Sequence, residues 1–367
     1  MEYPAFMGYQ KRNYVSECQL EFFIRKPVVN RGYLNSLAAN PAYIASEKHW
    51  HITLQQTTCY WYDLIINPPE FADTKYSISS RLKELRRDVE ETLEKRFIYF
   101  FVSRTKIRFD VSRPPKYSLF GKKLVINILV GRDKKRRRIA LSILDVNSKK
   151  SVTPEVEVTD SFIRFIHSEE LSFTYSIHDF LQSFDIDLGI TSEVHYVGMT
   201  KDPSDRPLSR EHRGITDTLY NVSNEDNDFF IYINLFKVLS DAKNHSHGLH
   251  FLVANSLIDE VPTQEEGNVI ESVLIEYFNC ASQDVNRKKE KGLLTNQLIS
   301  LAAKSNIQSI SAHIEIDPIN EYFIFGSKTV PAKPNHSFKI HIVDGTVKVE
   351  TFSSEDELRN QVKEMIE

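Results

Sequence analysis

The sequence predicts an α+β protein: a small antiparallel sheet flanked by helices, preceded by a separate basic mixed α+β domain. Segments rich in β-branched and aromatic residues alternate with amphipathic helices, basic side chains concentrate in the first half, and a short strand in the second half runs into a polar loop. The length of 367 residues favours more than one domain. We expect a basic domain at 1–168, a second domain at 169–300 and a β-rich extension with a terminal helix at 301–367.

The first half shows the periodicities of both helices and strands. From Ser77 to Arg96, apolar residues recur at three-and-four spacing, which predicts a helix. Two apolar segments flank a turn that begins at Gly131, which predicts a hairpin. Strands are expected at 19–26, 50–66, 97–109, 124–130 and 139–146.

The net charge of −4 conceals an uneven distribution along the chain. Residues 1–150 hold 28 basic and 15 acidic side chains, whereas the remaining 217 residues hold 18 basic and 35 acidic ones. This asymmetry predicts that the first half faces a polyanion. The alternative is that the two halves attract each other across an interface.

The predicted hairpin turn carries the densest basic run of the chain. Such a run beside a strand can lie along a phosphate backbone, and the alternative is a solvated face without a specific partner. The predicted nucleic-acid-binding residues are Lys134, Lys135, Arg136, Arg137 and Arg138, together with Lys201 in the second half.

Composition limits the class of protein and its compartment. The N-terminus has no apolar segment typical of a signal peptide, and no run of about 18 apolar residues occurs, so we expect no membrane span. Cys18, Cys59 and Cys280 are far apart and odd in number, which favours reduced thiols in the cytoplasm.

The residue types that can cleave a phosphodiester lie between 193 and 271. A short strand at 193–197 meets Gly198, and a polar loop leads to Arg206 and His212, while Glu271 is expected to open an amphipathic helix. A carboxylate can hold a hard divalent cation, an arginine can neutralise charge on the phosphate, and a tyrosine can relay the proton of attacking water.

At these residues the chain resembles the GIY-YIG nuclease superfamily, over roughly 170–290. Tyr196-Val197-Gly198 is similar to the YIG element, and Arg206 follows the glycine by eight residues, as the catalytic arginine of the family does. The resemblance implies that His212 belongs to the same site, and that Glu271, in the segment ESVLIEYFN, binds Mg²⁺ or Mn²⁺. It also implies a third strand at 228–240, and Asn286 resembles the asparagine that follows the glutamate helix.

The chain departs from the family at the first strand. It lacks a Gly-Ile-Tyr tripeptide at the expected distance before Tyr196. We expect 171–177 to supply this strand, with Tyr175 as the first catalytic tyrosine and 178–192 as an insertion. Met199 stands where many relatives have Lys or Gln.

Two other segments are singled out by pattern. His245, His247 and His250 could bind zinc by their spacing, but a loop or strand beside the nuclease cleft is the favoured interpretation. Residues 309–350 predict several strands with a turn at Asp344-Gly345, and 353–367 predict a helix.

The sequence thus predicts a metal-dependent endonuclease that hydrolyses DNA, with a role in restriction or defence against invading DNA by analogy only. An RNase is one alternative, and RNA is then the partner. A non-catalytic nucleic-acid-binding protein with the same fold is the other. The oligomeric state is open, with a homodimer as one option.

Overall fold

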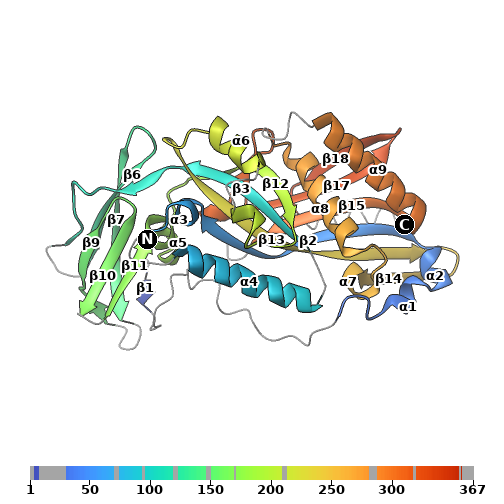
Figure 1. Ribbon diagram of the computed structural model, residues 1–367, viewed down its shortest axis with the longest axis horizontal. Coiled ribbons are helices and arrows are strands. Elements are labelled where there is room, and N and C mark those ends of the chain that lie inside the picture. Colours follow the sequence, from blue (N-terminus) through green and yellow to red (C-terminus); the bar gives the residue numbers. More distant parts are fainter. Residues whose placement is uncertain are drawn as a thin grey trace.

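The computed structural model describes residues 4–7, 30–69, 74–92, 96–118, 123–145, 150–168, 171–208, 213–280, 287–316, 320–354 and 357. The protein is a mixed α+β fold dominated by sheets (Figure 1). The expected strand at 19–26, His212, Asn286 and most of the helix expected at 353–367 lie outside the described residues.

One mixed sheet of nine strands dominates the described part of the chain, in the order β16-β12-β3-β13-β2-β15-β17-β18, with β14 paired to β13. Neighbours are antiparallel except for β15 against β2 and β16 against β12. The strands are β2 (Glu47–Trp61), β3 (Phe97–Thr105), β12 (Ser192–Thr200), β13 (Asn227–Asn244), β14 (Leu249–Ala254), β15 (Ile307–Glu315), β16 (Phe325–Gly326), β17 (Asn335–Val343) and β18 (Thr346–Phe352).

This sheet is not the small sheet that the sequence predicts for 170–290. Its strands come from all three expected domains, so boundaries near 168 and 300 do not separate them. The physical reason is visible in β3, where every residue from Phe97 to Arg104 is buried. A strand that is apolar on both faces needs neighbours on both edges and cover on both sides.

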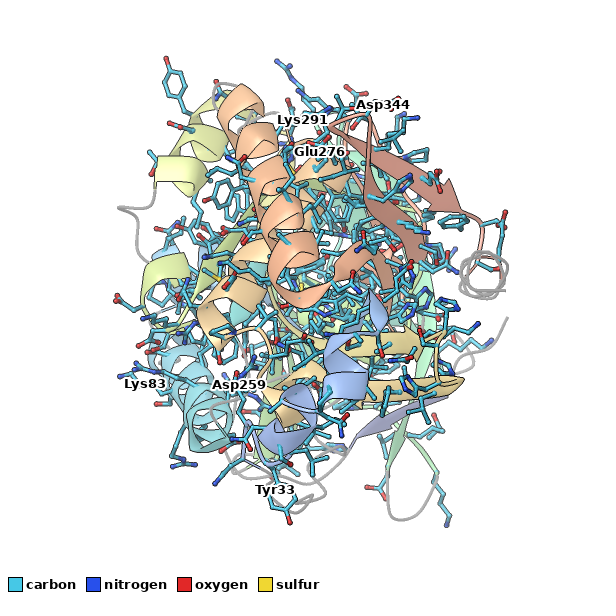
Figure 2. The ribbon with its side chains drawn as sticks, turned by 90° about the vertical axis from the view of Figure 1, so that its right-hand side faces the viewer. Tyr33, Lys83, Asp259, Glu276, Lys291 and Asp344 are labelled. Atoms are coloured by element: carbon cyan, nitrogen blue, oxygen red, sulfur yellow. The ribbon has the colours of Figure 1, made fainter. Side chains whose placement is uncertain are left out.

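Helices cover both faces of the sheet. On one face lie α8 (Thr263–Phe278) and α9 (Arg287–Ser305), and the Phe278 ring packs 5.6 Å from that of Phe100 on β3. Figure 2 shows the two helices side by side where Lys291 of α9 reaches Glu276 of α8, with Nζ and Oε1 3.7 Å apart.

The opposite face carries α3 (Asp63–Ile66), α4 (Thr74–Thr92) and α6 (Arg213–Asn221). Tyr62 at the start of α3 packs edge-on against Phe101 of β3, with ring centroids 5.1 Å apart. Ile78 and Leu82 of α4 are buried at the predicted spacing. The helix expected at 77–96 is therefore confirmed, with its ends shifted toward the N-terminus.

Residues 106–191 form an insertion between β3 and β12, which are neighbours in the main sheet. It contains two small sheets at one end of the molecule (Figure 1), and α5 (Ile177–Ser183) packs against them. Phe109, Phe165 and Phe180 form its aromatic core. The strands are β4 (Ile107–Phe109), β5 (Lys116–Tyr117), β6 (Leu124–Val130), β7 (Lys135–Asp145), β8 (Ser151–Val152), β9 (Glu155–Val158), β10 (Phe162–Ser168) and β11 (Leu171–Ser176), with β1 (Pro4–Met7) paired to β7.

The remaining short helices, α1 (Asn35–Ala38), α2 (Pro41–Ile44) and α7 (Asn255–Ile258), lie at the opposite end of the molecule from the insertion (Figure 1). The expected turn at Asp344-Gly345 joins β17 to β18, with positive φ at both residues. Within the described ranges, no helix is both long and apolar enough to cross a membrane.

Candidate active site

Tyr196 lies on β12 directly opposite β3, and its ring faces that of Tyr99. The antiparallel register pairs Tyr196 with Phe101 and Gly198 with Tyr99. The two tyrosine ring centroids are 5.9 Å apart. Two phenol side chains from neighbouring strands therefore lie together on one face of the sheet, with Tyr196 half-buried and Tyr99 fully buried.

Two glycines make room for this tyrosine pair. A Cβ atom on Gly198 would collide with the Tyr99 ring, and one on Gly214 would collide with the Tyr196 ring. Gly214 lies in the first turn of α6, so the N-terminus of this helix abuts Tyr196. The free N–H groups and the dipole of a helix N-terminus favour a negatively charged group nearby.

A β-bulge precedes Tyr196 and orients the strand. The register between β12 and β3 shifts between Val194 and Tyr196. The bulged residue His195 is buried, and its Nε2 is hydrogen bonded to Ser103 Oγ at 2.7 Å. Burial, together with the nearby Lys328, lowers the pKa of His195 to about 4, so the ring is neutral at pH 7. Bulges of this kind redirect a side chain without breaking the sheet.

The structure corrects the assignment of Tyr175. Its strand, β11, pairs with β10 in the insertion, and the Tyr175 ring packs against Phe165 and Phe184. The expectation that 171–177 supplies the strand beside β12 is wrong, because β3 pairs with β12 along the whole length of β12. The tyrosine that lies beside Tyr196 is Tyr99 of β3, in the tripeptide Phe97-Ile98-Tyr99.

The loop after β12 is held in place by polar contacts. Thr200 Oγ1 and the backbone of Asp202 exchange hydrogen bonds of 2.9 and 3.0 Å, and Arg86 of α4 forms an ion pair with the Asp202 carboxylate. Lys201 is exposed in this loop. The short 3-10 helix η2 (Arg206–Leu208) follows, so the backbone of Arg206 lies between β12 and α6. The Arg206 side chain and His212 lie outside the described part of the structure.

Glu271 is half-buried in the middle of α8, so the expectation that it opens the helix is wrong. A Cβ atom on Gly267 of α8 would collide with Met199, which places α8 on the Met199 face of β12. Side chains alternate along a strand, so Tyr196 points to the opposite face. On the side away from β3, β12 is paired only at Ser192 and Glu193, with β16, among the described residues. A ligand can therefore contact both Glu271 and Tyr196 only by passing around the rest of this edge of the sheet.

The expected divalent cation has one described carboxylate donor, Glu271. The described residues contain no cluster of three or more His, Cys, Asp or Glu side chains arranged for a metal ion. The histidines expected near β14 do not converge either: His250 Nε2 lies 2.6 Å from Asp241 Oδ1, while His247 contacts Asn244. Mg²⁺ commonly uses one or two carboxylates and completes its shell with water and phosphate. Glu271 is consistent with such a site.

The basic hairpin is exposed, as the sequence predicts. The turn occupies Gly131–Lys134, and β7 begins at Lys135, so the last arginines lie on the strand rather than in the turn. Arg136 Nε contacts Asp110 Oδ2 at 2.7 Å. The other four side chains of the run have no ion pair within the described part of the chain; they are Lys134, Lys135, Arg137 and Arg138.

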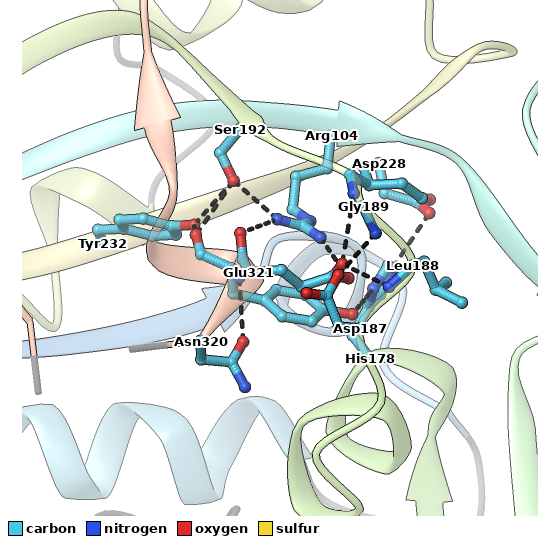
Figure 3. A network of polar contacts seen from close by, with 12 residues as sticks. Arg104, His178, Asp187, Leu188, Gly189, Ser192, Asp228, Tyr232, Asn320 and Glu321 are labelled. Carbon is cyan, nitrogen blue, oxygen red and sulfur yellow. Dashed lines mark hydrogen bonds and ion pairs between the residues drawn. The ribbon is translucent and has the colours of Figure 1, made fainter. Parts of the chain in front are cut away.

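A buried polar network that the sequence does not predict lies at the start of β12 (Figure 3). Arg104 Nη2 contacts Glu321 Oε1 at 2.8 Å and Arg104 Nη1 donates to Ser192 Oγ at 3.1 Å. The guanidinium lies 3.9 Å from the centroid of the Tyr322 ring. Glu321 Oε2 accepts a hydrogen bond of 2.7 Å from the backbone N–H of Leu188. These contacts join the 3-10 helix η4 (Glu321–Phe323) to the chain entering β12.

His178 extends the network toward the insertion. Its Nδ1 lies 2.9 Å from the Tyr322 hydroxyl and its Nε2 lies 3.1 Å from Asp228 Oδ2. Asp228 also contacts Arg108 at 2.9 Å. The arrangement resembles an acid–base pair, but His178 is only 1% exposed, and burial lowers its pKa. We assign it a structural role, because no substrate can reach a side chain so deeply enclosed.

Searches against protein-family models, curated proteins and solved structures found no match to this chain.

Proposed function

We propose that the protein is a metal-dependent phosphodiesterase that acts on nucleic acid, with DNA as the first candidate substrate. The observation that carries this proposal is the contact of Tyr99 with Tyr196, beside the N-terminus of α6. The strand order β12-β3-β13 supports it, because an antiparallel trio with a tyrosine on each of two neighbouring strands is the arrangement that the GIY-YIG resemblance implies.

Each residue has a role that follows from its chemistry. The half-buried Tyr196 hydroxyl relays the proton of the attacking water, the fully buried Tyr99 ring holds Tyr196 in position, and the helix N-terminus stabilises the negative charge of the phosphate. Arg206, eight residues beyond Gly198, supplies a guanidinium for the phosphate oxygens. Glu271 would hold the divalent cation, whose chemistry is to polarise the phosphoryl group. The exposed hairpin holds the polyanionic substrate.

The test is a cleavage assay on plasmid DNA and structured RNA, with Mg²⁺ or with EDTA. We expect Tyr196→Phe to slow cleavage by about 10²- to 10⁴-fold, the usual contribution of a general base, whereas Tyr99→Phe keeps the buried ring and should slow it less. Glu271→Gln should abolish cleavage and leave binding unchanged, because affinity comes mainly from Lys and Arg contacts with phosphate.

Tyr175→Phe is the matched control, because it removes the same hydroxyl from a tyrosine of the insertion and should leave the rate unchanged. Wild-type protein that binds nucleic acid but never cleaves it would favour the non-catalytic alternative. A Tyr196→Phe variant with the wild-type rate would contradict the site as we place it.

A further inference from the structure

The helix α6 connects the tyrosine pair to the basic hairpin. Its first turn abuts Tyr196 at Gly214. Beyond its C-terminus, the backbone carbonyl of Asn224 accepts a hydrogen bond of 2.8 Å from Lys106 Nζ, and Asp226 Oδ1 lies 3.9 Å from Arg132 Nε in the hairpin turn. The two ends of this short segment therefore lie against the two proposed substrate contacts.

The hairpin turn and the tyrosines share one face of β3. A Cβ atom on Gly131 would lie 3.4 Å from Thr105 Cγ2. Thr105 is six residues after Tyr99, an even number, so both side chains point to the same side of the strand. Phe101, the partner of Tyr196, is four residues from Thr105, which corresponds to about 13 Å along the strand.

Tyr220 lies on this route and is exposed to solvent. It is 90% exposed, the highest value among the large exposed hydrophobic residues of the described chain. Thr216, one helical turn earlier, is also exposed, so both lie on the outward side of α6. Two carboxylates lie beyond the helix end: Asp226 is near Arg132, and Glu225 is exposed.

We propose that α6 is a track for single-stranded nucleic acid and that the Tyr220 ring stacks on a base between the tyrosine pair and the hairpin. This inference rests on the proposed function and names the form of its substrate. An exposed aromatic ring near a cationic hairpin is the combination that binds single strands, because a base face is accessible only when it is unpaired. The separation of about 13 Å along β3, between the partner of Tyr196 and the residue beside the hairpin turn, corresponds to about four stacked nucleotides at 3.4 Å each.

The test is a binding titration in EDTA, which prevents metal-dependent cleavage, with labelled oligothymidylates of two to twelve nucleotides. We expect wild-type affinity to rise with length until both contacts are reached. Tyr220→Ala should weaken binding of the longest oligonucleotides by about tenfold, within the range of one lost base–aromatic stack. The shortest oligonucleotides should bind the variant and the wild type equally.

Two control variants isolate the ring. Tyr220→Phe keeps the stacking surface and should bind like the wild type. Tyr33→Ala removes another exposed tyrosine, 74% exposed and projecting from the surface in Figure 2, and should have no effect. If the wild type binds oligonucleotides and Tyr220→Ala matches it at every length, the inference is wrong and the proposed function stands. A wild type that binds neither oligonucleotide nor plasmid overturns both.

Discussion

The hairpin between β6 and β7 and the network around Arg104 use the same chemical group in opposite environments. Arg104 is fully buried and its guanidinium contacts a carboxylate, a hydroxyl and an aromatic ring. Arg137 and Arg138 of the hairpin are exposed and have no ion pair with any described residue. A buried charge is tolerated only when it is paired, whereas an unpaired exposed charge is available to a partner. Position, rather than residue type, separates structural cations from those available for binding.

The largest effect that tests this contrast is expected at Arg104. Arg104→Met leaves Glu321 buried without its cation, which should lower the free energy of unfolding by about 3–5 kcal/mol. Arg137→Met makes the same chemical change at an exposed site and should alter it by less than about 0.5 kcal/mol. Urea denaturation of both variants measures the difference. Equal stabilities would show that the buried pair is not needed for the fold.

An intermediate effect is expected at the hairpin. Replacing Lys134, Lys135, Arg136, Arg137 and Arg138 with Gln should weaken nucleic-acid binding and flatten its dependence on salt. Each lost phosphate contact reduces the log–log salt slope by roughly 0.9 on duplex or 0.7 on single strands. If the melting temperature falls while the salt slope is unchanged, the hairpin stabilises the protein and does not bind nucleic acid.

The smallest effect on stability is expected from a change of pH, which titrates Glu321 of the buried network. Burial, reinforced by a hydrogen bond with Asp187, raises the pKa of Glu321 to about 7, against the opposing charge of Arg104. The folded protein then binds more protons than the unfolded chain between about pH 4.5 and 7. The contribution of this group to stability is present below pH 4.5 and is lost as pH rises through 7.

Asp187→Asn removes the carboxyl group that is hydrogen bonded to Glu321, so the loss of stability with rising pH should become smaller. Urea midpoints at pH 5, 6.5 and 8, compared between the variant and the wild type, separate this group from the other titrating residues. Identical pH profiles would show that the two carboxyls are not coupled.

Local sequence pattern was sufficient to predict many helices and strands, but not which strands pair with each other in the sheet. The strand at 97–109 was expected, and the structure contains β3 and β4 there; the helix near 77–96 and the hairpin at 131 were also found. The pairing of β12 with β3 was not predicted, because Arg104 and its neighbour Ser192 are 88 positions apart, and periodicity carries no information about pairing across such a distance. Gly198 and Arg206 draw attention to Tyr196 in the sequence, whereas Tyr99 stands out only once β3 is seen beside β12.

The network around Arg104 could not be predicted for a related reason. Arg104 occupies a strand of hydrophobic residues, and its partner Glu321 lies 217 positions away. Its basic side chain is of the same type as those of the nearby Lys106 and Arg108, which follow it at alternate positions. Its burial is decided by the tertiary structure, when η4 closes over the end of the sheet.

The insertion between β3 and β12 also has a consequence for the order of folding. Both strands that flank β3 in the sheet, β12 and β13, are synthesised after the 86 residues from 106 to 191. Until then, an apolar strand is left with two unpaired edges, a state that invites aggregation. Early folding of the insertion would bring its two ends together and shorten the loop that must close before β12 can pair with β3. The insertion would then act as an internal scaffold for folding, and the tyrosine pair would be among the last contacts to form.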